Sequence, residues 1–219
     1  MIVGGRHFDD YADAFPEGLL PQVFRLLAEQ WPHFRRTTEN PLENRITNRF
    51  VGYLHRAMRT MRKPFHFDYR PKLPDADADS ERGEPDIKVQ AGRRGDVVFT
   101  IECKRLNLPG RSNAGEYVGR VGMGCFVEEQ YISNPESGGM LGYVMDNRIS
   151  RAQTAINRQL AKKAADLKLM FPAELVPAPF ADEVTRVMLT KHELARGSFT
   201  IYHLLLPYDD KEVVEGCEP

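Results

Sequence analysis

Two carboxylates and an ammonium group lie at the two ends of a segment in which apolar and polar residues alternate. Asp86 follows Pro85, and after fifteen further residues come Glu102 and Lys104, separated by Cys103. Carboxylate oxygens are the ligands that magnesium prefers, and a protein usually supplies one or two of them while water and substrate phosphate fill the other positions. The cation lowers the pKa of a bound water, and a neighbouring ammonium orients that water or stabilises negative charge in the transition state. These residue types therefore indicate metal-assisted hydrolysis of phosphodiester bonds.

The segment that carries these residues is predicted to be a β-hairpin. A loop at residues 92–96 pairs Ala91 with Val97, and this register places Asp86 opposite Glu102. Side chains alternate between the two faces of a strand, so one face is wholly apolar and the other carries the charges. We expect Glu102 and Lys104 to lie about 7 Å apart on an exposed polar face. The apolar face holds Ile87, Val89, Val97, Phe99, Ile101 and Cys103, and the polar face holds Asp86, Lys88, Gln90, Val98, Thr100, Glu102 and Lys104.

A predicted helix before the hairpin adds a third carboxylate, that of Glu43. Asn40 is expected to cap this helix and Pro41 to be its first residue. Glu43 has two interpretations, because it is placed either to bind the metal or to bond back to the Asn40 amide in a capping pair. An apolar residue recurs at every fourth position of the helix, through Leu42, Ile46, Phe50, Leu54 and Met58.

Basic residues are grouped along the chain although the formal net charge is only -1. Such separation can create a positive cleft around an acidic metal site, and a partner subunit can also supply affinity. The residues expected to contact nucleic acid are Arg93, Arg94, Arg105, Arg111, Arg151, Arg158 and Lys162. The helix before the hairpin also ends in basic residues, which suit either a nucleic-acid backbone or a solvated terminus favoured by the helix dipole. They are Arg56, Arg59, Arg62 and Lys63.

Pro85-Asp86 together with Glu102-Cys103-Lys104 resembles the motif of the PD-(D/E)xK nuclease superfamily, also called the restriction-endonuclease-like fold. The resemblance implies an α/β fold with a restriction-endonuclease-like core, in which a mixed central β-sheet is flanked by helices. It also implies that Asp86 and Glu102 bind Mg2+ or Mn2+, that Lys104 is the catalytic lysine, and that a helix before the hairpin contributes an acidic ligand. The alternative is a solvated strand face with an ordinary Glu/Lys pair.

The implied activity is that of a magnesium-dependent endonuclease that hydrolyses DNA, in restriction or antiviral defence. An RNA substrate stays open, because metal-activated water is competent on either polymer. A second class is a non-cleaving nucleic-acid-binding or assembly subunit of a defence or repair complex. The intact set of Asp86, Glu102 and Lys104 favours the enzyme. The expected partners are DNA and either a second copy of the chain or another subunit of a defence system.

Length and composition predict one domain. At 219 residues and 42% hydrophobic, the chain can bury one substantial core. We expect an N-terminal lead at 1–40, a core at 41–206 and an acidic tail at 207–219. Three cysteines without CxxC pairing argue against a disulfide framework or a zinc site and predict a cytoplasmic protein. No apolar run has the length of a membrane helix or the form of a signal peptide, so no membrane partner is expected.

The part of the chain after the motif is predicted to complete the sheet. We expect a turn at 134–139, a buried strand at 140–145, a helix at 150–169 capped by Ser150, and strands at 184–190 and 199–206. The glycines of 115–131 suit close packing against the sheet or approach of a sugar-phosphate backbone, and packing is the expected reason. His192 and His203 lack partners at catalytic spacing, which indicates a structural role.

Overall fold

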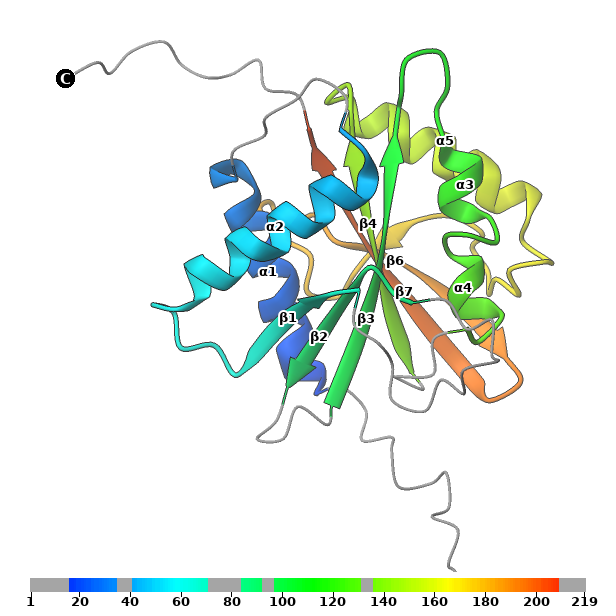
Figure 1. The fold of residues 1–219 in the computed structure, drawn as a ribbon. Coiled ribbons are helices and arrows are strands. Elements are labelled where there is room, and N and C mark those ends of the chain that lie inside the picture. Colours follow the sequence, from blue (N-terminus) through cyan, green and yellow to red (C-terminus); the bar gives the residue numbers. More distant parts are fainter. Residues whose placement is uncertain (1–15, 35–40, 71–83, 92–96, 131–135, 209–219) are drawn as a thin grey trace, which may run out of the picture.

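The molecule is built on a mixed seven-stranded sheet with helices on both faces (Figure 1). The computed structural model describes residues 16–34, 41–70, 84–91, 97–130 and 136–208. The strand order is β1-β2-β3-β4-β7-β6-β5. The strands are β1 (Phe65–Tyr69), β2 (Ile87–Ala91), β3 (Val97–Leu106), β4 (Ser137–Val144), β5 (Val176–Pro177), β6 (Met188–Leu194) and β7 (Gly197–Pro207). The predicted α/β class with a mixed sheet between helices is therefore confirmed.

The predicted hairpin register is confirmed from Ile87 to Ala91, and the ladder ends before the predicted pair of Asp86 with Glu102. Ala91 pairs with Val97 and Ile87 with Ile101 in the antiparallel β2–β3 ladder, while the loop at 92–96 lies outside the described residues. On its other side β3 pairs in parallel with β4, which pairs in parallel with β7. β3 is thus the strand at which the sheet changes from antiparallel to parallel pairing.

Helices cover the two faces of the sheet in two groups. In Figure 1, α1 and α2 lie on one face, and α3, α4 and α5 lie on the other. Each group packs on its own cluster of buried apolar side chains. Two 3-10 turns, η2 (Glu17–Leu19) and η3 (Trp31–His33), flank the first helix. The helices are α1 (Leu20–Gln30), α2 (Glu43–Met58), α3 (Ala114–Val118), α4 (Gly124–Val127) and α5 (Ile149–Lys162).

The expected N-terminal lead at 1–40 needs correction for its described part, residues 16–34. Helix α1 buries Phe24 and Leu27 in the same cluster as Phe99 of β3. Trp31 then donates a hydrogen bond from Nε1 to the carbonyl oxygen of Pro207 at 2.6 Å. This segment is therefore part of the core. The expected tail also begins too early, because β7 includes Pro207.

Several predicted boundaries are wrong by a few residues. Leu42 precedes the first residue of α2 and is exposed, so burial along that helix begins at Ile46. Helix α5 begins at Ile149 and ends at Lys162, which places Ser150 inside the helix. Asn40 lies outside the described residues. Ala152, Ile156 and Leu160, which recur at every fourth position, form the buried face of α5.

The boundaries of two strands also differ from the prediction. The predicted turn at 134–139 is wrong for residues 137–139, which belong to β4. A Cβ atom added to Gly138 would lie 2.4 Å from the ring of Phe126, so the glycine lets α4 pack directly on this strand. Strand β6 begins at Met188, four residues later than expected, whereas β7 contains the whole predicted 199–206 strand.

The glycine-rich segment after β3 forms α3 and α4. A Cβ atom on Gly122 would lie 2.2 Å from the carbonyl oxygen of Tyr117, and one on Gly119 would lie 2.6 Å from that of Gly115. These glycines therefore allow the turn between the helices to pack against the α3 backbone, which supports the packing explanation. Within the described ranges, no helix is long and apolar enough to cross a membrane.

Candidate active site

The candidate site lies beside the first residue of β2, Ile87, which pairs with Ile101 of β3. Strand β3 continues beyond Ile101, so the next two β3 amides that face this edge have no partner in β2. The amide of Cys103 donates instead to Oδ2 of Asp86 at 3.0 Å. The amide of Arg105 donates to Oε2 of Glu43 at 2.8 Å. Two carboxylates, one from the residue before β2 and one from the first residue of α2, thus replace the missing strand.

Lys104 places an ammonium group among these carboxylates. Its Nζ atom lies 2.6 Å from Oε1 of Glu102 and 3.2 Å from Oε1 of Glu43. It also donates to the carbonyl oxygen of Cys103 at 2.9 Å. A lysine ammonium has three donors, so these oxygens account for all of them. The structure therefore brings Glu43, Glu102 and Lys104 into direct contact and holds Asp86 on the adjoining amide; we call these four residues the carboxylate cluster.

The expected exposure of the polar face is wrong. Asp86 is 4%, Glu102 6% and Lys104 8% exposed. Glu102 lies beside Met140 of β4 in register, and that methionine packs in the apolar cluster with Tyr117. Helices α3 and α4 thus cover a surface that the hairpin alone would leave open. The burial also argues against an ordinary solvated Glu/Lys pair.

The electrostatic environment fixes the charge of Lys104. Burial alone would lower the pKa of its ammonium, but the charges of Glu102 and Glu43 outweigh burial and raise this pKa well above its usual value. Burial raises the pKa of Glu43, and the Lys104 charge and the Arg105 amide oppose the shift only in part. Lys104 therefore stays protonated at neutral pH and acts as a cation.

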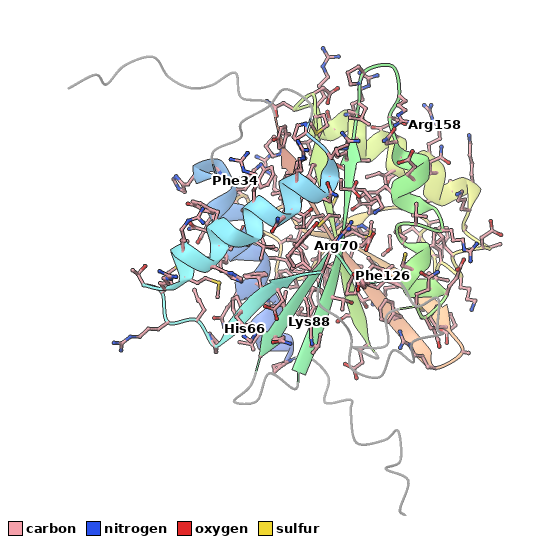
Figure 2. The ribbon with its side chains drawn as sticks, viewed as in Figure 1. Phe34, His66, Arg70, Lys88, Phe126 and Arg158 are labelled. Atoms are coloured by element: carbon pink, nitrogen blue, oxygen red, sulfur yellow. The ribbon has the colours of Figure 1, made fainter. Side chains whose placement is uncertain are left out.

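Arg70 is a member of the site that the sequence analysis missed. Its amide donates to the carbonyl oxygen of Asp86 at 3.0 Å, and its Nε atom lies 3.6 Å from Oδ1 of Asp86. The side chain is half exposed and is labelled near the middle of Figure 2. The alternation of apolar and polar residues from Phe65 to Tyr69 is typical of a strand, so the sequence could have shown that Arg70 follows a strand, whereas its position beside Asp86 comes from the pairing of β1 with β2.

The predicted nucleic-acid contacts are dispersed. Arg105 bonds to Glu43 through its amide, and its Nη1 atom donates to the carbonyl oxygen of Pro41 at 2.9 Å. Arg111 lies 3.8 Å from Glu116. On the other side of the sheet from Phe34, α5 exposes Arg158 (Figure 2). Arg151 and Lys162 are exposed on the same helix, whereas Arg93 and Arg94 lie outside the described residues.

A second buried polar group crosses β6 and β7 as a chain of hydrogen bonds. His192 Nδ1 lies 2.8 Å from the carbonyl oxygen of Leu167 and must donate to it. His192 Nε2 then accepts from Thr190 Oγ1 at 2.8 Å, and this hydroxyl accepts from His203 Nε2 at 3.0 Å. His203 Nδ1 finally accepts from the Tyr117 hydroxyl at 3.0 Å. Every member is satisfied with both histidines neutral, which supports their structural role.

The donor chemistry of the cluster suits a hard divalent cation. Asp86 and Glu102 supply carboxylate oxygens, and the Cys103 carbonyl supplies a further oxygen beside them. Among the described residues, no group of three or more histidine, cysteine, aspartate or glutamate side chains is arranged to hold a metal ion. Magnesium keeps several waters and often needs only one or two carboxylates. The oxygen donors therefore fit magnesium better than a metal that requires a complete protein cage.

Comparison with known proteins gave no relationship: no family model matches the chain, and no curated protein or solved structure matches it.

Proposed function

We propose that this protein is a magnesium-dependent nuclease of the PD-(D/E)xK type with a restriction-endonuclease-like core, and that it hydrolyses DNA. The observation that carries the proposal is the contact of the Lys104 ammonium with the carboxylates of Glu102 and Glu43. Asp86 adds a third carboxylate on the neighbouring amide. Carboxylates and an ammonium buried together at a break in strand pairing are costly to fold, and hydrolysis at a metal would give them a use.

The roles follow from the residues themselves. Asp86 and Glu102 would hold the cation, together with the carbonyl oxygen of Cys103. The bound cation would polarise the scissile phosphate and lower the pKa of the attacking water. The Cys103 amide holds the Asp86 carboxylate in place, which supports this proposed role. Glu43 keeps its second oxygen on Arg105, so it can support the cluster without being a direct ligand.

Lys104 would stabilise charge on the phosphate. If Glu102 and the Cys103 carbonyl held a cation, they would be weaker acceptors for the Lys104 ammonium, which could then donate to a phosphate oxygen. Its raised pKa keeps it charged, so it serves as an electrostatic stabiliser and not as a general base. Arg70, half exposed beside Asp86, is placed to meet another phosphate oxygen.

The cleavage assay that tests this proposal uses two pairs of matched variants. Wild-type protein should cleave DNA with Mg2+ or Mn2+ and not in chelator. Glu102→Gln and Lys104→Met should each lose orders of magnitude in rate, whereas Glu193→Gln and Lys191→Met, the same substitutions at exposed positions of β6, should retain it. Full activity in Glu102→Gln or Lys104→Met would contradict the assigned role.

The second candidate is a non-cleaving nucleic-acid-binding or assembly subunit of a defence or repair complex, in which the buried cluster and its fully engaged Lys104 would serve only the fold. DNA affinity at fixed ionic strength separates the two candidates. In a nuclease the carboxylates repel a phosphate, so calcium should tighten DNA binding, and Glu102→Gln should tighten it in chelator. If neither affects the affinity, no phosphate enters the cluster and the binding subunit is the better account.

The proposed function also includes the nucleic acid that is cleaved and the biological process in which the protein acts. DNA is the expected polymer, and RNA oligonucleotides belong in the same assay because the chemistry serves both. We propose a role in restriction or antiviral defence, with either a second copy of this chain or another defence subunit as partner. Sedimentation of the purified protein with and without DNA tests the self-association.

A further inference from the structure

The exposed face of α2 and its C-cap residue Arg59 carry a row of arginines. Arg45, Arg49, Arg56 and Arg59 are all exposed. At 3.6 residues per turn they lie, with Gly52, within a sector of about 80° and extend over about 21 Å. After its first residue the helix contains no acidic side chain. We call these four residues the arginine stripe.

The helix itself does not explain the arginine stripe. Arginines near the C-terminus of a helix are favoured by its dipole, but Arg45 lies in the first turn, where positive charge is disfavoured. Like charges four residues apart, such as Arg45 and Arg49, also destabilise a helix. In the described part of the chain, Arg45, Arg56 and Arg59 have no ion-pair partner. The charges are therefore placed for an external anion.

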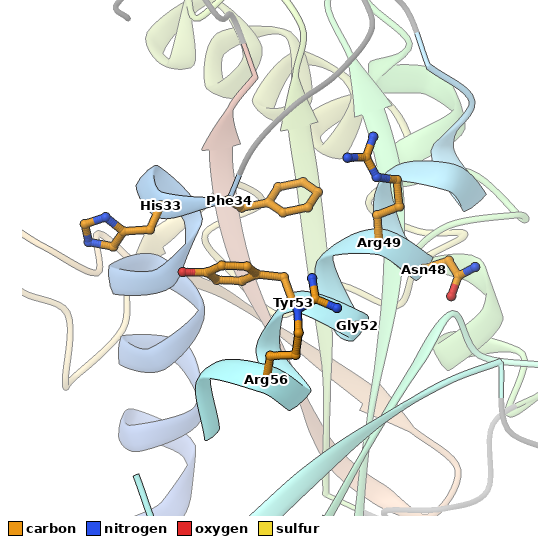
Figure 3. A pocket seen from close by; sticks show the side chains of 7 residues that line it. All are labelled: His33, Phe34, Asn48, Arg49, Gly52, Tyr53 and Arg56. Atoms are coloured by element: carbon orange, nitrogen blue, oxygen red, sulfur yellow. The ribbon is translucent and has the colours of Figure 1, made fainter. Parts of the chain in front are cut away.

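A pocket opens at the middle of the arginine stripe, between α2 and the end of η3 at His33 and Phe34 (Figure 3). Its volume is about 570 Å³, within the range of small-molecule sites. Gly52 leaves space between two arginines, because a Cβ atom there would meet only Nη1 of Arg56, at 3.9 Å. The rings of Phe34 and Tyr53 line the pocket, with centroids 6.0 Å apart.

The aromatic wall is held in place before any ligand arrives. The Tyr53 hydroxyl donates to Oε1 of Gln30 at 3.2 Å, and Phe34 is buried against Trp31 with ring centroids 5.5 Å apart. The guanidinium carbon of Arg49 lies 5.9 Å from the centroid of the Phe34 ring. Aromatic rings bordered by arginines are the combination that binds an unpaired base and its phosphate.

We propose that the arginine stripe binds the phosphates of a nucleic-acid strand and that the pocket takes one unpaired nucleotide of it. The stripe starts two residues after Glu43, whose carboxylate contacts Lys104, so a strand along α2 leads to the carboxylate cluster. The identity of the polyanion rests on the proposed nuclease function. A single-stranded substrate, or a duplex with an unpaired nucleotide, follows, because a base stacked within a duplex cannot enter the pocket.

The test measures fluorescence anisotropy with a labelled single-stranded 20-mer and its duplex, in chelator and over a series of salt concentrations. Arg56→Gln should weaken single-strand binding by roughly tenfold and reduce the slope of log affinity against log salt by about 0.7. Gly52→Leu fills the pocket without changing charge and should weaken single-strand binding by about tenfold while leaving duplex binding unchanged. Lys191→Gln, on β6, and Gly18→Leu, where an added Cβ meets no atom within 4 Å, are the matched controls.

Equal affinities and salt slopes for Arg56→Gln and Lys191→Gln would overturn the stripe, and unchanged single-strand binding by Gly52→Leu would overturn the pocket. Wild-type binding to phosphatidylserine vesicles without oligonucleotide binding would assign the stripe to a membrane surface and also overturn the proposal. Circular dichroism checks the fold of each variant. Because binding is measured in chelator, its result is independent of cleavage. A protein that shows these losses but never cleaves would retain this inference and lose the nuclease function, and a nuclease without these losses would do the reverse.

Discussion

Oε2 of Glu43 accepts a hydrogen bond from the amide of Arg105 at 2.8 Å, which joins the first residue of α2 to β3 across 62 positions of the chain. The other oxygen of the same carboxylate contacts Lys104. The start of the helix and the center of the candidate chemistry therefore share one side chain. This hydrogen bond also fixes the start of α2 relative to the carboxylate cluster, so the arginine stripe and the cluster are positioned together.

Asp86 should be structural as well as catalytic. Asp86→Ala leaves the buried amide of Cys103 without its acceptor, which should lower the free energy of unfolding by about 1–3 kcal/mol. Asp86→Asn retains an acceptor oxygen and should lose less stability, while both variants lose metal-dependent cleavage. Urea unfolding and the cleavage assay give the two measurements. If Asp86→Ala were as stable as the wild type, the observed hydrogen bond would contribute nothing to folding.

Removal of the buried ammonium should be costly. Lys104→Met leaves the carboxylates of Glu43 and Glu102 without their cation, and loss of one partner of a buried ion pair typically costs about 3–5 kcal/mol. Urea unfolding should show a loss of this order, whereas Lys191→Met on the exposed side of β6 should change little. Adding Glu102→Gln to Lys104→Met removes one of the stranded charges and should recover part of the loss. A double variant less stable than Lys104→Met would refute this explanation.

Divalent cations should stabilise the folded protein before any DNA is present. A ligand at a hundred times its Kd raises the free energy of unfolding by about 2.7 kcal/mol, so Tm should rise with Mg2+ or Ca2+ concentration. Glu102→Gln should abolish the rise and Glu193→Gln should keep it. An identical rise in both variants would place the cation elsewhere.

Acid should destabilise the fold through its two neutral histidines. Burial lowers the pKa of His192 to about 4 and that of His203 to about 3, the latter with a contribution from the His192 charge. Below pH 6.5 the unfolded chain binds protons that the folded protein excludes. Their contribution to stability is therefore complete above pH 6.5 and declines as the pH falls towards 4 and then 3, by roughly 1 kcal/mol per pH unit for each histidine.

Urea unfolding between pH 7 and pH 5 measures this dependence. His192→Gln removes one of the two titrating groups, so its free energy of unfolding should fall less steeply with acid than that of the wild type. Equal slopes would show that protons bind at other groups in this range.

The hairpin could be predicted because its information is local. Alternation of polar and apolar residues predicted the register that pairs Ala91 with Val97, because a one-residue shift would have exchanged the apolar and the charged side chains between the two faces. The burial of Glu102 and Lys104 could not be predicted in the same way, because it depends on α3 and α4, which reach this face only through the fold. The contact between Glu43 and Arg105 joins residues 62 positions apart, so the local alternation of residues could not indicate it.

Helix ends were less predictable than helix faces. The spacing of Ala152, Ile156 and Leu160 gave the buried face of α5, but Leu167 extended the same pattern past Lys162, where the helix ends. Leu167 is nevertheless buried, and its carbonyl oxygen accepts from His192. Apolar periodicity therefore predicted the burial of Leu167 correctly, but it did not predict that the helix ends before this residue.

The hydrogen bond from Trp31 to Pro207 has a consequence for how the chain folds. It joins positions 176 residues apart, so a ribosome must add almost all of the described chain before α1 can meet the strand beside it. Until then α1 can pack on α2 and β3, through Trp31 against Phe50 and Phe24 against Phe99, but the part of its apolar surface that faces β7 has no native cover. Trp31 is the only tryptophan, and its ring stacks on Tyr143 with centroids 5.3 Å apart. Its fluorescence during refolding should therefore follow closure of the whole sheet and not formation of the helix.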